Sequence, residues 1–89
     1  MMAEQSVQIR NKNGLHARPA AEIVKAASKF KSDITISRED IEVNGKSIMG
    51  VMMLAAECGA SIVLRATGDD AEQAIEAIAA LIANKFGER

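Results

Sequence analysis

The only histidine and the only proline of the chain, His16 and Pro19, stand close together in the segment Asn13–Ala20. Gly14 allows a tight turn, and proline suits the first turn of a helix, where its missing N–H is not needed. A helix is therefore predicted to begin between His16 and Pro19. His16 would lie at the positive end of that helix, where free N–H groups and the macrodipole attract anions. Arg18 adds a planar guanidinium that binds phosphate oxygens in pairs.

A histidine in this place is suited to hold a phosphoryl group. An imidazole that is neutral in the cell has one ring nitrogen free to act as a nucleophile. The alternative is that His16 only occupies the N-cap position of a helix, which is the commoner role of an arbitrary histidine at such a place. The residue types alone leave both interpretations open.

The segment Gly14–Ala20, Gly-Leu-His-Ala-Arg-Pro-Ala, resembles the active-site signature of the HPr family. HPr proteins are the histidine-containing phosphocarriers of the bacterial phosphoenolpyruvate-dependent sugar phosphotransferase system. The segment Asn44–Met52, Asn-Gly-Lys-Ser-Ile-Met-Gly-Val-Met, resembles a second signature of the family at the expected spacing. The likeness extends over essentially all 89 residues.

The resemblance implies that a phosphoryl group arrives from enzyme I on the Nδ1 atom of His16 and leaves to an enzyme IIA domain. Arg18 is expected to order the group in transit, and the backbone N–H groups of Ala17 and Arg18 are expected to assist. Phosphoryl transfer depends mainly on positioning and on compensating negative charge. The site is therefore expected to work without a metal or another cofactor.

Ser47 is predicted to cap a short helix that carries Ile48, Met49 and Met52. Taken alone, these apolar residues could be ordinary core. A helix this short cannot bury all its sides, however, and adaptable methionine side chains suit a surface that accepts several partners. The resemblance implies that this helix packs beside the active histidine, and Ala20 is assigned to the same partner surface.

The resemblance also implies a regulatory role for Ser47, as the phosphorylation site of HPr kinase/phosphorylase in bacteria that have that enzyme. This role is compatible with an N-cap, which stabilises a helix by about 1 kcal/mol. A phosphate at a helix N-terminus is locally favourable, but its charge inside an apolar docking patch would oppose an acidic partner.

The elements that must position these residues follow from the periodicity of the chain. Polar and apolar residues alternate, as in strands, in Ser6–Arg10, Asp33–Ser37, Ile41–Val43 and Ser61–Thr67. Helical spacing follows Ala17 and, later, Asp69, which has capping-box spacing with Glu72. The last helix is expected to end near Gly87.

This order suits an α+β open-faced sandwich, although periodicity alone also permits a ferredoxin-like order. The HPr resemblance implies the sandwich: a four-stranded antiparallel sheet with two long helices and one short helix on one face. The other face is expected to be solvated, with residues such as Gln8, Thr35, Glu42 and Arg65.

The bulk properties predict one domain, residues 1–89, too short for separate catalytic and substrate domains. A formal net charge of −1 and 2% aromatic residues argue against a nucleic-acid partner. One cysteine, Cys58, and one histidine cannot supply a convincing metal site and suit a reducing cytosol. Neither a signal peptide nor a run long enough to span a bilayer is present, so a cytoplasmic protein without membrane insertion is expected.

Three alternatives compete with a monomeric sugar-system carrier. A nitrogen-related HPr paralogue in a regulatory phosphorelay has the same features. A purely regulatory binding module, like relatives that lack the histidine, is disfavoured by His16. A metal-dependent enzyme is disfavoured by the small set of ligands.

Overall fold

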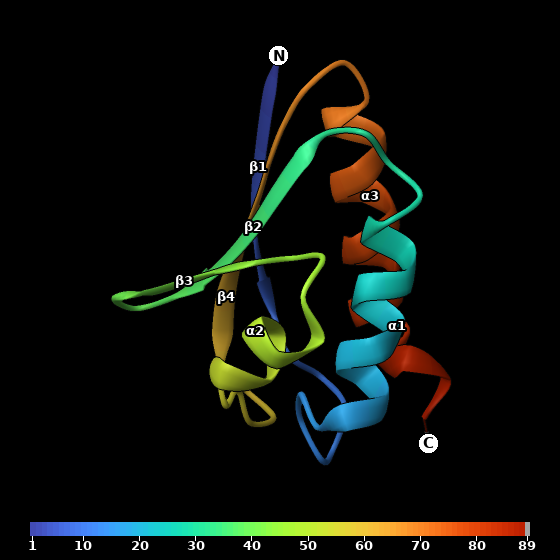
Figure 1. Ribbon diagram of the computed structural model, residues 1–89. Helices are drawn as coiled ribbons and strands as arrows, with labels where there is room; N and C mark the ends of the chain where they lie inside the picture. Colours follow the sequence, from blue (N-terminus) through green and yellow to red (C-terminus); the bar gives the residue numbers. More distant parts are fainter. Residues whose placement is uncertain (89) are drawn as a thin grey trace.

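The computed structural model describes residues 1–88, and its four strands form one antiparallel sheet in the order β1-β4-β2-β3. Figure 1 shows α1 and α3 side by side along one face of this sheet, and α2 contacts both α1 and β3. The elements are β1 (Met2–Gln8), α1 (Ala17–Ala27), β2 (Asp33–Arg38), β3 (Ile41–Asn44), α2 (Ile48–Met53), β4 (Ser61–Thr67), α3 (Ala71–Ala83) and the 3-10 turn η1 (Lys85–Gly87). The predicted open-faced sandwich is confirmed.

The first strand begins earlier than predicted. It covers Met2–Gln8 rather than Ser6–Arg10, because all seven of its residues pair with β4, from Met2 opposite Thr67 to Gln8 opposite Ser61. The strand lies at the edge of the sheet and is largely polar, so alternation marked only part of it. Ile9, beyond the strand, is still tied to the β4 side by a hydrogen bond from its N–H to Ala60 O, 2.8 Å long.

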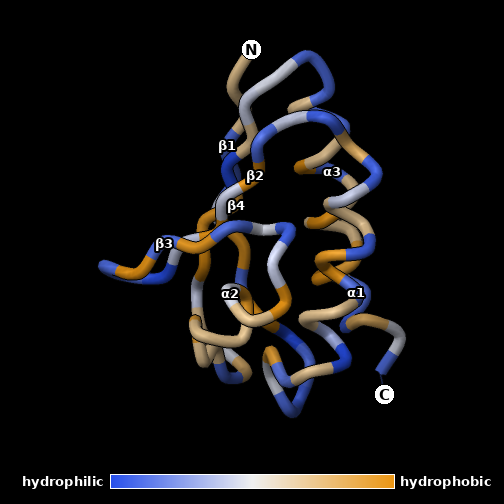
Figure 2. The backbone as a smooth tube through the Cα atoms, viewed as in Figure 1, coloured by the Kyte–Doolittle hydropathy of each residue, from blue (hydrophilic) through white to orange (hydrophobic). Residues whose placement is uncertain are grey.

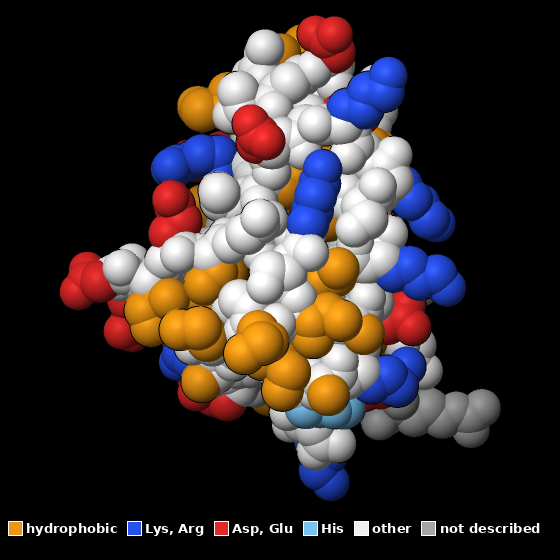
Figure 3. Space-filling model, viewed as in Figure 1, with side chains coloured by type: hydrophobic (Ala, Val, Ile, Leu, Met, Phe, Trp, Pro, Cys, Tyr) orange, Lys and Arg blue, Asp and Glu red, His pale blue; other side chains and the backbone are white. Residues whose placement is uncertain are grey.

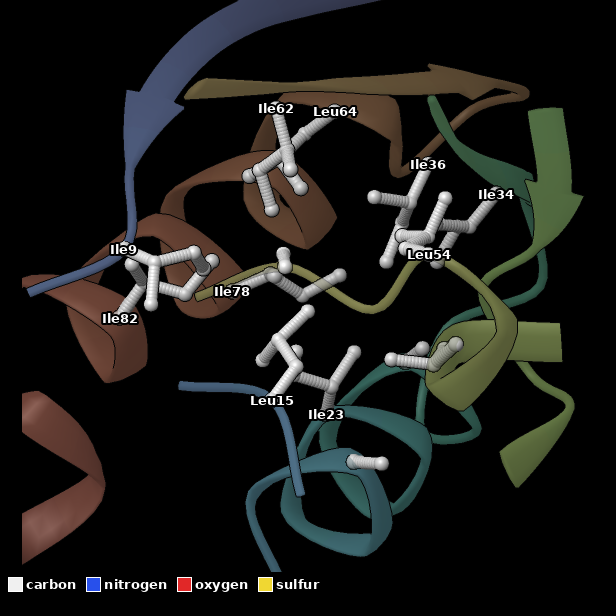
Figure 4. Close-up of a cluster of buried hydrophobic side chains, with 14 of the residues drawn as sticks. Ile9, Leu15, Ile23, Ile34, Ile36, Leu54, Ile62, Leu64, Ile78 and Ile82 are labelled. Atoms are coloured by element: carbon white, nitrogen blue, oxygen red, sulfur yellow. The ribbon is translucent and has the colours of Figure 1, made fainter. Parts of the chain in front are cut away.

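The core lies between the sheet and the long helices. Figure 4 shows the aliphatic side chains that meet there, and Figure 2 shows that hydrophilic residues concentrate in turns such as the tip of the β2–β3 hairpin. The fully buried large aliphatic side chains are Ile9, Ile23, Ile36, Leu54, Ile62, Leu64, Ile78, Ile82 and Val51. Burying one such side chain contributes about 1.5–3 kcal/mol, so this layer fixes the position of α1, whose first residues carry the candidate site.

The opposite face of the sheet is polar, as predicted. Arg65 on β4 donates from Nε to Glu4 Oε2 on β1, 2.8 Å away, and its Nη1 lies 3.6 Å from Glu42 Oε2 on β3. Gln8 and Glu42 are exposed and Thr35 is half-buried. None of the helices among residues 1–88 is long and apolar enough to cross a membrane.

The start of α3 differs from the predicted capping box. The N-cap residue is Asp70, not Asp69, and its side chain makes no hydrogen bond to its own helix. Its carboxylate instead accepts from the N–H of Lys31 at 2.9 Å, the N–H of Ser32 at 3.0 Å and the hydroxyl of Ser32. Asp70 therefore fastens the α1–β2 turn to α3, a long-range role that local spacing does not reveal.

These hydrogen bonds, that from the Ser32 hydroxyl first and that from the Lys31 N–H next, hold the pKa of Asp70 below its ordinary value. A depressed folded-state pKa means that the ionised carboxylate stabilises the fold. This contribution is fully present above the ordinary aspartate pKa, about 3.9, and is lost as the pH falls toward the folded-state pKa.

We therefore expect Asp70→Ala to lower the urea midpoint of unfolding at pH 7, and the difference from wild type to shrink on acidification. Asp69→Ala, at the exposed neighbouring position, is the matched control and should unfold close to wild type. Equal midpoints for the two variants at pH 7 would contradict this role of Asp70.

Candidate functional site

His16 is the N-cap residue of α1, in an extended conformation with φ −82° and ψ −171°. Its carbonyl oxygen accepts from the N–H of Ala20 at 3.0 Å. Pro19 has no N–H, so the free amide donors of the first turn are those of Ala17 and Arg18, which have no acceptor within residues 1–88. The predicted start of the helix is confirmed. The His16 side chain is 43% exposed, so its ring is accessible beside two free amide donors.

The loop before His16 is held against the segment that follows α2. The N–H of Leu15 donates to Ala56 O at 2.9 Å, and the Leu15 side chain is buried. Gly14 has φ +69°, and a Cβ there would collide with Ala56 O and with Glu57 Cα. Glycine is thus required both by the backbone conformation and by the close approach of the two segments.

Arg38 holds the segment that follows α2, which carries Ala56. Its Nη1 donates to Leu54 O at 3.2 Å and to Ala55 O at 2.8 Å, while its Nη2 lies 2.6 Å from Glu57 Oε1. Ala55 has a positive φ of 48°, a conformation that non-glycine residues adopt only when neighbours hold them in it. The guanidinium at the end of β2 thus binds the two carbonyl groups that precede Ala56 and the side chain of Glu57 that follows it.

The carboxylate of Glu88 lies directly beside His16 and Arg18. Its Oε2 is 3.1 Å from His16 Nε2 and 3.0 Å from Arg18 Nη2, and its Oε1 accepts from Asn11 Nδ2 at 3.3 Å. Partial burial opposes ionisation of Glu88, but the hydrogen bonds from Asn11, His16 and Arg18 outweigh it and lower its pKa. The site therefore contains an ionised carboxylate that no sequence motif indicated.

The chain after α3 turns sharply to bring Glu88 to this place. Lys85, Phe86 and Gly87 have positive φ values of 57°, 55° and 74°. The two non-glycine residues carry roughly 1–3 kcal/mol of strain each. Phe86 is 5% exposed and packs in the core, which offsets that strain. Arg18 Nη2 also lies within 3.5 Å of Phe86 O.

Asn11 is the second residue of the site that sequence reasoning missed. It is fully buried, and its Nδ2 donates to Gly14 O at 2.8 Å as well as to Glu88. Glu88 lies 77 positions after Asn11 and 72 after His16, and neither Asn11 nor Glu88 belongs to a recognisable local pattern. Only the folded chain brings Asn11 and Glu88 together.

Ser47 is the N-cap of α2, as predicted, and its Oγ accepts from the N–H of Gly50 at 3.1 Å. Only Val51 of this six-residue helix is buried. The helix exposes an apolar surface, here called the α2 patch, formed by Ile48 (44% exposed), Met49 (78%), Met52 (42%) and Met53 (69%). Figure 3 shows hydrophobic side chains gathered on the face that also carries the pale blue histidine. The predicted exposure is confirmed, and Met53 is an addition to it.

Ala20 does not lie on this surface. It is fully buried between the helix and the core, so the expectation that it forms part of a partner surface is wrong. Ala20 shares the buried face of α1 with Ile23 and Ala27, at the helical spacing of residues that face the core.

His16 projects from the surface at the start of α1. Three surface cavities of about 320–380 Å³ lie beside β1, β2, β3 and α3, and neither His16 nor Arg18 lines them. Within residues 1–88, no group of three or more histidine, cysteine, aspartate or glutamate side chains is placed to hold a metal ion. The geometry suits a group carried on the ring of His16 and handed between proteins.

Comparisons with known proteins agree with this geometry. The family model described as "PTS HPr component phosphorylation site" matches residues 3–84. The phosphocarrier protein HPr of Treponema pallidum is 51% identical over 87 residues, which are 98% of this chain and 99% of that protein. A crystal structure of HPr from Thermoanaerobacter tengcongensis superposes with a TM-score of 0.94 at 50% identity, covering 98% of each chain. An HPr dimer from the same organism matches with a TM-score of 0.79 at 52% identity, covering 92% of this chain and 94% of that one.

Proposed function

The chain belongs to the HPr family of phosphocarrier proteins of the phosphotransferase system, and we propose that it carries a phosphoryl group on Nδ1 of His16. In this proposal the group comes from enzyme I and passes to an enzyme IIA domain. The observation that carries it is the exposed imidazole of His16 at the N-terminus of α1, beside the free N–H groups of Ala17 and Arg18.

The local charges support transfer without a metal. The lone pair of Nδ1 attacks phosphorus, the bond from phosphorus to the donor atom breaks, and its electron pair stays with the donor. Negative charge on the phosphoryl oxygens is met by the two amide donors and by the Arg18 guanidinium, whose side chain is 54% exposed. An exposed cation can follow the group as it arrives and leaves, which suits a carrier that must also release it.

The α2 patch supports docking on protein partners. Ile48, Met49, Met52 and Met53 expose an apolar surface on the face that carries His16, and monomeric proteins seldom expose such clusters without a partner. We propose that enzyme I and enzyme IIA domains bind here in turn. Phosphorylation of Ser47 by HPr kinase/phosphorylase would place a double negative charge at the edge of the α2 patch and weaken this docking.

The proposed carrier is a single cytoplasmic domain, residues 1–89, that acts as a monomer. The contacts that build the His16 site come from one chain, although three related structures are dimers. We propose the sugar branch, with a nitrogen-related paralogue in a regulatory phosphorelay as the alternative. The enzyme IIA domain that accepts the phosphoryl group decides between these branches.

The direct test is phosphorylation of the purified protein with enzyme I and phosphoenolpyruvate. We expect His16→Ala to fold normally and to take up no phosphate, because it removes the nucleophile and leaves the core intact. Lys12→Ala, an exposed residue of the same loop, is the control and should be phosphorylated. Acid-labile, base-stable phosphate on His16→Ala would rule out the assignment.

Arg18→Ala should still form phosphohistidine, but about tenfold more slowly, as expected for a loss of about 1.4 kcal/mol of transition-state stabilisation. Rapid-quench measurements with enzyme I would give the forward and reverse rates. Lys25→Ala removes an exposed positive charge near the other end of α1 and should leave both rates nearly unchanged. Wild-type rates in Arg18→Ala would show that the guanidinium has no part in transfer.

Ser47→Asp should keep or slightly raise thermal stability, because aspartate also caps helices and an exposed carboxylate there gains about 0.3–1 kcal/mol. Its affinity for enzyme I should nevertheless fall, since docking must desolvate the new charge beside the α2 patch. Titration against enzyme I with parallel melting curves measures both effects. Gln73→Glu adds one charge on an exposed position of α3 and is the control. Unchanged affinity of Ser47→Asp would place α2 outside the interface.

A further inference from the structure

We propose that Glu88 is a positioning residue for His16: it accepts the Nε2–H of the imidazole and so keeps the lone pair on Nδ1. This inference rests on the proposed function and deepens it. It concerns a residue that belongs to neither signature segment and that approaches His16 from 72 positions away in the chain.

The chemistry of the contact fixes the tautomer. An ionised carboxylate has only acceptor atoms, so the 3.1 Å approach of Glu88 Oε2 to His16 Nε2 is a hydrogen bond only when Nε2 carries a proton. A neutral imidazole has a single N–H. A proton held on Nε2 therefore leaves Nδ1 as the nitrogen with the free electron pair.

The carboxylate is itself fixed in position. Asn11, which is fully buried, donates to Oε1 at 3.3 Å, and Arg18 donates to Oε2 at 3.0 Å. The Glu88 side chain is only 16% exposed. Its N–H donates to Lys85 O at 2.9 Å, and the buried Phe86 anchors the preceding turn. Both oxygens and the backbone are thus held, so that the acceptor faces the imidazole in a defined direction.

The same contact helps during transfer. When Nδ1 forms its bond to phosphorus and the donor bond breaks with its electron pair, the imidazole keeps the Nε2 proton and becomes positively charged. Glu88 faces that charge across the Nε2–H hydrogen bond. Within residues 1–88, Arg18 uses only Nη2 in hydrogen bonds to other groups, which leaves N–H donors of the guanidinium for the phosphoryl oxygens.

The test uses the fact that the chain has one histidine. Nitrogen-15 NMR of the unphosphorylated full-length protein reports directly which ring nitrogen carries the proton. Wild type should show the Nε2–H tautomer in large excess. In Glu88→Ala the excess of the Nε2–H tautomer should fall toward that of a free histidine side chain. Glu88→Gln should retain most of this excess, because its amide oxygen can still accept the hydrogen bond from Nε2. Glu76→Ala, at an exposed position of α3, is the matched control and should match wild type.

Phosphorylation kinetics provide the second readout. For Glu88→Ala we expect kcat with enzyme I to fall about two- to tenfold with little change in KM, less than for loss of the orienting carboxylate in a buried triad because this ring is exposed. An unchanged tautomer ratio would overturn the inference. Faster phosphorylation would overturn it too, and would show Glu88 to be a competitor of the phosphoryl group for Arg18. If the wild-type protein takes up no phosphate, the proposed function is refuted. The tautomer measurement would still test the role of Glu88, because it uses the unphosphorylated protein.

Discussion

The hydrogen bond from the N–H of Leu15 to Ala56 O is the contact on which the site depends. It joins the loop that ends at His16 to the segment that follows α2, and the collision that a Cβ of Gly14 would make shows how closely they approach. The histidine and the α2 patch therefore belong to one rigid surface. A partner that docks on α2 meets the imidazole in a fixed place, which matters because misplacement by about 1 Å can cost a transfer reaction 100-fold.

Two opposite demands meet at this surface. In the proposed function, the N-terminus of α1 attracts a dianionic group, whereas α2 stays apolar and uncharged so that it can dock. The fold separates them by giving the free N–H groups of Ala17 and Arg18 to one helix and the methionines to another. Ser47 is the N-cap of α2, so in the proposed function a phosphate there would alter docking and leave the imidazole chemistry intact.

The parts of the fold and site that could be predicted are those encoded locally. The spacing of Gly14, His16 and Pro19 specified the start of α1, because turn and capping preferences act within a few residues. The exposure of α2 followed from its shortness. The role of Asp70 could not be predicted: its neighbour Asp69 had the better capping-box spacing with Glu72, yet Asp70 binds the turn at residues 31 and 32.

The burial of Ala20 and the place of Glu88 were missed for related reasons. Alanine occurs both in cores and on surfaces, so its residue type did not exclude Ala20 from the partner surface. The structure shows that Ala20 is buried. Glu88 reaches His16 only through the left-handed conformation of Lys85 and Phe86, which those residue types do not favour. Tertiary packing around Phe86 imposes it, and nothing in the local sequence indicates such an outcome.

The pairing of β1 with β4 has a consequence for how the protein is made. Met2–Gln8 is made before Ser61–Thr67, so this strand has no partner until β4 has been added. The contact between His16 and Glu88 needs the turn η1 as well. While these later residues are still inside the ribosomal tunnel, the sheet cannot close and the imidazole cannot meet its carboxylate.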